Sequence, residues 1–117
     1  ATEVWALALD GGILAAGGSD GRVRVYGSPN WMLLATLWEA TDVISAVALA
    51  DGVLAAGSHD GKVRVYGGPD WALQSTLKEA TDSTSAVGLA GGVLAAGSRD
   101  MRVRVYSGPR PDTAAGA

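Results

Sequence analysis

Three aspartates at a regular spacing are the first candidates for chemistry in this chain. Asp20, Asp60 and Asp100 lie 40 residues apart, and glycine follows the first two. A calcium loop places several oxygen ligands within about twelve residues, whereas each of these segments offers one carboxylate. An aspartate in a tight turn typically accepts backbone N–H bonds. We therefore predict that the three aspartates are structural turn residues and that the chain has no metal site.

The single histidine, His59, directly precedes one of these aspartates. A metal site or a general acid–base pair needs further histidine, cysteine or carboxylate groups, and cysteine is absent from the sequence. The spacing suggests no Ser/His/Asp arrangement, and no G-x-x-x-x-G-K-[ST] phosphate loop occurs. The sequence predicts a protein that is not an enzyme and has no cofactor.

Composition excludes two classes of partner. The 117 residues are 48% hydrophobic, enough for a core, and carry a formal net charge of −3. Nucleic acid and anionic membrane surfaces require concentrated lysine and arginine, so neither partner is expected. No apolar run reaches the roughly 18 residues of a membrane span. No basic segment precedes an apolar one as in a signal peptide. The compartment stays open, with the cytoplasm favoured over secretion.

The chain repeats itself every 40 residues. The segment LAAG occurs at 14–17, 54–57 and 94–97, and tyrosine recurs at positions 26, 66 and 106. A period of this length is typical of a solenoid or a propeller, in which each repeat is one supersecondary unit.

Each repeat predicts strands and no helix. In the first repeat, residues 6–9, 13–17, 22–26 and 31–37 form four apolar or alternating runs. Turn-forming residues rich in glycine, aspartate and proline separate them, and alternation with period 2 indicates half-buried strands. The third repeat lacks a fourth run, and the stretch 109–117, with two prolines, is predicted to be a flexible tail.

The sequence resembles the WD-repeat family. The segment 53–66, VLAAGSHDGKVRVY, contains a small-residue strand, then Ser-x-Asp-Gly, then Val-Arg-Val before an aromatic residue. The resemblance implies an all-β propeller of four-stranded antiparallel blades. We expect blades at about residues 1–40, 41–80 and 81–108, the last without its outer strand.

Both signature dipeptides of that family are altered. Tyr66-Gly67 stands where the family has Trp-Asp, and Glu39-Ala40 stands where it has Gly-His. The His–Asp–Ser–Trp network that the resemblance implies therefore cannot form in full.

Three blades are too few to close a ring. Propellers typically have about four to eight blades, and a three-blade arc would expose the apolar faces of its end blades. We expect head-to-tail self-association, as a homodimer with six blades or a homotrimer with nine. Small residues on inner strands and tryptophans on outer ones favour the dimer. The chain could also be a fragment of a longer propeller or an engineered one.

Positions that differ between the repeats mark a candidate binding surface. Ser19, His59 and Arg99 precede the turn aspartates, and the residues that lead into the first strand of each repeat also change. The resemblance places both groups on one face, around the channel where WD-repeat proteins often bind peptides. The competing interpretation is drift on exposed loops.

Two of the four tryptophans are candidate anchors for a partner. Trp5 is replaced by serine in the other repeats, and Trp38 is replaced by Lys78, which suggests exposure. Trp31 and Trp71 recur in register and are expected to pack.

Basic side chains alternate along the third strand of each repeat, as in Arg22 and Arg24. We expect them to pair with acidic residues of adjacent strands or to protect a sheet edge. Together these observations predict a protein- or peptide-binding scaffold that self-assembles. The alternative is a purely structural assembly that binds no ligand.

Overall fold

The computed structural model describes residues 3–68, 71–78, 83–90, 93–100 and 102–107. These residues contain eleven strands and no helix, and therefore no helix with the length and apolar character of a membrane span. The strands form three antiparallel sheets in which each strand pairs with the next along the chain. The predicted all-β propeller fold is confirmed.

The first blade contains β1 (Val4–Asp10), β2 (Ile13–Gly18), β3 (Val23–Gly27) and β4 (Met32–Leu37). The second contains β5 (Ile44–Ala50), β6 (Val53–Ser58), β7 (Val63–Gly67) and β8 (Ala72–Leu77). The third contains β9 (Thr84–Ala90), β10 (Val93–Ser98) and β11 (Val103–Ser107). The predicted tail at 109–117 lies outside the described residues.

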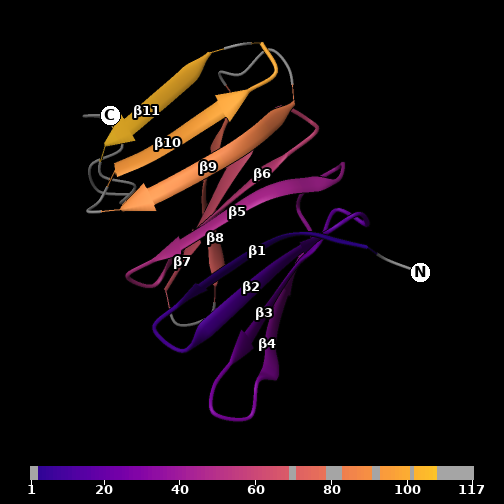
Figure 1. Cartoon of the computed structure of the whole chain (residues 1–117), viewed down its shortest axis with the longest axis vertical. Helices are drawn as coiled ribbons and strands as arrows, with labels where there is room; N and C mark the ends of the chain where they lie inside the picture. Colours follow the sequence, from indigo (N-terminus) through magenta and orange to yellow (C-terminus); the bar gives the residue numbers. More distant parts are fainter. Residues whose placement is uncertain (1–2, 69–70, 79–82, 91–92, 101, 108–117) are drawn as a thin grey trace.

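The three blades fan out from their first strands (Figure 1). Strand β5 lies between β1 and β9, and it also contacts β2, while β9 contacts β6. Small residues on β2 and β6 permit this approach. A Cβ added to Gly17 would overlap the side chain of Ile44, and one added to Gly57 would lie 2.5 Å from Cγ2 of Thr84.

Two hydrophobic cores lie between the blades. The core between the first and second blades comprises Ala15, Val23, Val25, Leu37, Ile44, Leu54, Ala56, Tyr66 and Trp71. The core between the second and third blades comprises Ala55, Val63, Val65, Leu94 and Ala96. Because alternate residues of a strand point to opposite faces, the second blade contributes one face to each core.

Each first strand has a β-bulge near its beginning. The pairing register shifts between Val4 and Ala6 and between Ile44 and Ala46, and the third blade shows the same shift opposite Gly97 and Ser98. A bulge leaves one residue unpaired and re-aims its side chain. The residue concerned is Trp5 in the first blade and a serine in the others.

The fourth strand of the first blade begins one residue later than predicted. Trp31 adopts a φ of 55° and Trp71 a φ of 58°, so each lies in the turn before the strand. These left-handed conformations are unusual for a large side chain, and nothing in the local pattern indicates them.

Candidate functional site

Each blade carries an aspartate in the turn between its second and third strands. One carboxylate oxygen accepts a hydrogen bond from the backbone N–H two residues later, at 3.0 to 3.1 Å; these pairs are Asp20–Arg22, Asp60–Lys62 and Asp100–Arg102. In the first two blades a glycine in the left-handed conformation follows the aspartate: Gly21 has a φ of 79° and Gly61 a φ of 84°. The aspartate therefore holds the turn.

The other carboxylate oxygen of each aspartate forms an ion pair with an arginine of the following strand. The N–O distances are 2.8 Å for Arg24–Asp20, 2.9 Å for Arg64–Asp60 and 2.9 Å for Arg104–Asp100. These arginines pair with acidic residues as predicted, but each partner lies in the turn before the arginine's own strand and not on an adjacent strand. The backbone bond already orients the aspartate, so its second oxygen faces the side chain four residues later.

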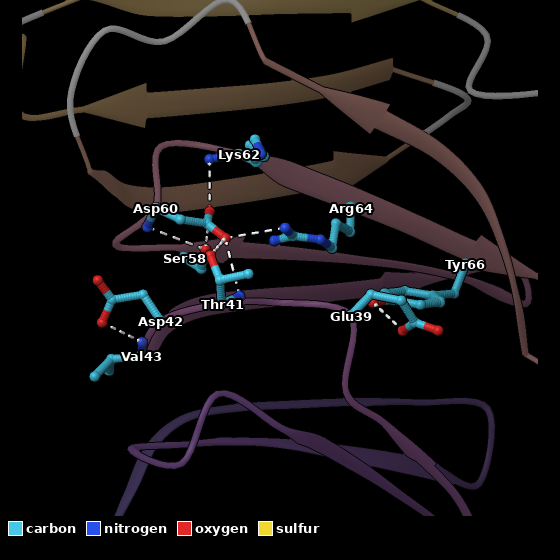
Figure 2. A network of polar contacts seen from close by, with 9 residues as sticks. All are labelled: Glu39, Thr41, Asp42, Val43, Ser58, Asp60, Lys62, Arg64 and Tyr66. Atoms are coloured by element: carbon cyan, nitrogen blue, oxygen red, sulfur yellow. Dashed lines mark hydrogen bonds and ion pairs between the residues drawn. The ribbon is translucent and has the colours of Figure 1, made fainter.

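Asp60 is the centre of a polar network that extends beyond its own turn (Figure 2). It accepts hydrogen bonds from the backbone N–H of Thr41 at 3.2 Å, from Oγ1 of Thr41 at 3.0 Å, and from the hydroxyl of Ser58. Thr41 belongs to the linker that follows the first blade. The network therefore attaches that linker to the second blade.

A second bond attaches the same linker two residues earlier. The hydroxyl of Tyr66 donates to Oε1 of Glu39 at 3.0 Å. Glu39 and Tyr66 are the residues that differ from the signature glycine and tryptophan of the WD repeats that the sequence resembles, and here they bond to each other. The sequence suggested only that the usual network was incomplete.

Burial and hydrogen bonding act in opposite directions on Asp60. Burial would raise its pKa, but the bonds from Ser58, Arg64, Thr41 and Lys62 hold the pKa well below its usual range. Burial, together with the bond to Glu39, raises the pKa of Tyr66 well above its usual range. Asp60 is thus a stable anion and Tyr66 a neutral donor at physiological pH. Neither group is poised for proton transfer at that pH.

The positions that vary between repeats adjoin one another within each blade. The backbone N–H groups of Ser19, His59 and Arg99 donate at 2.9 Å to the carbonyls of Glu3, Val43 and Ser83, respectively. The residue before each turn aspartate therefore lies beside the lead-in to the first strand. We call this surface the variable rim.

Two of the predicted binding residues meet across the boundary between the first two blades. The ring centroids of Trp5 and His59 are 5.7 Å apart, with the planes at 74°. The indole N–H of Trp5 donates to Oε1 of Glu3 at 3.2 Å, and the hydroxyl of Ser19 accepts from the N–H of Glu3 at 3.0 Å. Trp5 is nevertheless half exposed, at 50%. A contact between residues 54 positions apart could not be inferred from local sequence.

Of the remaining predicted residues, Ser19 bonds to Glu3 as above, and Trp38 and Arg99 are not part of the ring contact. Trp38 is 67% exposed, and the guanidinium of Arg22 lies 5.5 Å from the centroid of its ring. Arg99 is exposed on the third blade. Among the described residues, no group of three or more histidine and carboxylate side chains is suited to a metal ion.

Comparison with known proteins agrees with this architecture. The family model described as "WD domain, G-beta repeat" matches residues 1–27. No curated protein sequence matches the chain.

Two solved structures illustrate the likeness in fold. A computationally designed protein is similar with a TM-score of 0.86 and 23% identity, over 93% of this chain and 34% of that one. A chain of the mitotic checkpoint complex is similar with a TM-score of 0.82 and 21% identity, over 94% of this chain and 36% of that one. This chain therefore spans about a third of the length of either. The chain is a three-blade β-propeller arc, and its first 27 residues match the WD-repeat model.

Proposed function

We propose that this chain is a non-catalytic protein-binding scaffold that closes a propeller ring with further copies of itself. The WD-type propeller fold suggests a protein-binding scaffold. The observation that carries self-assembly is the exposure of apolar faces at both ends of the arc. We call the side of a blade that faces the preceding blade its front face, and the opposite side its rear face.

The front face of the first blade is apolar and uncovered. Val4 is 61% exposed, whereas its equivalent in the second blade, Ile44, is 2% exposed. Trp31 is 45% exposed, whereas its equivalent Trp71 is 9% exposed. Leu7 and Leu9 are exposed as well. Residues that build a core in the second blade thus face solvent in the first.

The rear face of the third blade shows the same difference. Val103 is 74% exposed, whereas its equivalent Val63 is 3% exposed. Val93 and Val105 on the same face are also exposed. The front face of the first blade therefore resembles the front face of the second blade, and the rear face of the third blade resembles the rear face of the second. Together they match the two sides of an internal blade boundary. A contact between them would bury the apolar surface that monomeric proteins rarely leave open.

Sedimentation equilibrium of the 117-residue chain tests this proposal. We expect a particle of two or three times the 11.8 kDa chain mass. Twice the mass corresponds to the homodimer with six blades and three times to the homotrimer with nine. A folded particle of 11.8 kDa at micromolar concentration would refute self-assembly.

The variable rim, together with Trp38 beyond it, is the proposed contact surface for a peptide or protein. Ser19, Trp5 and His59 would contribute from the first boundary, Arg99 from the third blade and Trp38 from the outer end. Exposed tryptophans supply large contact area. A peptide array probed with the wild type and with Trp5→Ser, the residue found in the other repeats, measures this: loss of selected peptides is expected for the variant.

A purely structural assembly is the second candidate function. The likeness to a computationally designed protein favours it, as does the high similarity of the repeats. In that case the array would select no peptide although the chain assembles.

A further inference from the structure

Each blade boundary in this chain has one glycine that accommodates one β-branched residue. Gly17 on β2 lies against Ile44 at the start of β5, and Val47 follows at 3.4 Å from the position of its Cβ. Gly57 on β6 lies against Thr84 at the start of β9 in the same way, with Val87 at 3.3 Å. Any side chain at either glycine would overlap the next blade.

The glycine position and the β-branched position each occur once more in the chain, in the third and the first blade, and there neither has its packing partner among the described residues. Gly97 is the equivalent of Gly17 and Gly57, and no atom of the described residues lies within 4 Å of its Cβ position. Val4 is the equivalent of Ile44 and Thr84, and it is exposed. The third blade therefore has a glycine, Gly97, with no β-branched residue of the described chain packed against it. The first blade, at the other end of the arc, has a β-branched residue, Val4, with no glycine of a preceding blade to pack against.

A serine directly follows the β-branched residue in the second and third blades, and the hydrogen bond that it forms to a neighbouring blade depends on the same alignment of blades. The hydroxyl of Ser45 donates to the carbonyl of Gly57 at 3.3 Å and also to the carbonyl of Thr84 in the next blade. The hydroxyl of Ser85 donates to the carbonyl of Gly97 at 3.3 Å. The carbonyl that would correspond to that of Thr84 belongs to Val4.

We infer that copies of this chain join with Val4 of one copy seated over Gly97 of the next. This inference rests on the proposed self-assembly and specifies its register. The contact is heterologous, because a front face meets a rear face, and it repeats around the ring until the ring closes. Ser85 would donate to the carbonyl of Val4 across the contact, as Ser45 does to Thr84 within the chain.

Gly97→Ala separates this register from other ways of associating. The new methyl group has free space in the single chain, and Gly97 has no left-handed φ, so the fold is expected to be unchanged. In the assembly the methyl would occupy the place of Val4. Overpacking of this kind should weaken association by about tenfold to a hundredfold.

Gly88→Ala is the matched control. Gly88 on β9 likewise has no atom of the described residues within 4 Å of its Cβ position, and the other repeats have Ala8 and Ala48 there. Alanine therefore suits the internal boundaries at this position, and Gly88→Ala should assemble like the wild type.

The measurement is sedimentation of the wild type and of each variant over a range of concentrations, with circular dichroism as the check on folding. Val4→Asp is a second variant that acts from the other side of the contact, since its carboxylate would be buried over Gly97. Dissociation of Gly97→Ala and Val4→Asp, with Gly88→Ala assembled, is expected. If Gly97→Ala assembles as tightly as the wild type, the register is wrong although self-assembly stands. A monomeric wild type would refute self-assembly itself.

Discussion

The aspartate turn is more exposed in the first blade than in the second. Asp20 and Arg24 form an ion pair at 2.8 Å with side chains 23% and 30% exposed, whereas Asp60 and Arg64 pair at 2.9 Å with side chains 10% and 6% exposed. Asp60 also accepts two bonds from Thr41, in the linker of the preceding blade. The two turns share the aspartate, glycine and arginine, so the difference comes from the neighbouring blade and from Ser58, which is Gly18 in the first repeat.

The largest expected difference between two equivalent positions is in the stability cost of removing Trp71 or Trp31. Trp71 lies in the core between the first two blades, whereas its equivalent Trp31 is on the free front face. Trp71→Ala should lower the free energy of unfolding by about 3–5 kcal/mol. Trp31→Ala should lower it by less than about 1.5 kcal/mol in the single chain. Urea denaturation monitored by circular dichroism, at equal concentrations that keep both variants monomeric, measures both. Equal losses would show that the first blade's front face is covered within one chain.

The next largest expected difference is in the stability cost of removing the carboxylate of Asp60 or of Asp20. Asp60→Asn would leave the buried guanidinium of Arg64 without its anion, which should cost about 3 kcal/mol. Asp20→Asn removes a more exposed pair and should cost about 1 kcal/mol or less.

The pH dependence gives a second test of the Asp60 network. The pKa of Asp60 is lowered in the folded state, so its contribution to stability is present above its ordinary value of 3.8 and is lost as the pH falls below that value. Acid titrations of unfolding should show a flatter acid limb for Asp60→Asn than for the wild type. Parallel acid limbs would contradict the assigned network.

A smaller effect is expected at the second blade boundary. Ile44 fills the first boundary, whereas Thr84 at the second has a buried Oγ1 with no hydrogen-bond partner among the described residues. Thr84→Val keeps the methyl group that lies against Gly57 and removes the unpaired hydroxyl. We expect a gain of about 1 kcal/mol in the free energy of unfolding, measured by thermal and urea denaturation. A loss of stability would indicate a partner for the hydroxyl.

The smallest effect concerns the outer end of the first blade. Trp38→Lys installs the residue of the second repeat and replaces the contact between Arg22 and the indole ring. A loss of about 0.5–1 kcal/mol is expected for an exposed cation–π contact. Urea denaturation in low and high salt separates this loss from repulsion between the two cations.

Local features of the fold were predictable. The repeat, the strands and the turns follow from period-2 alternation and from aspartate and glycine at tight turns, which depend on residues a few positions apart. The exposure of Trp38 was also predicted correctly. The ion pairs of the arginines were assigned to the wrong elements, because alternation gives the face of a side chain and not its partner.

The amino-acid sequence alone determined that this chain consists of repeated antiparallel β-blades, since strand and turn formation depends on local periodicity and backbone preference. Only the tertiary structure decided which copies of a repeated residue are buried: Trp71 lies in a core and Trp31 faces solvent. It also decided which distant groups meet, such as Trp5 with His59 and Thr41 with Asp60. The physical reason is that burial and electrostatic environment come from the neighbouring blade, which a repeat's own residues do not specify.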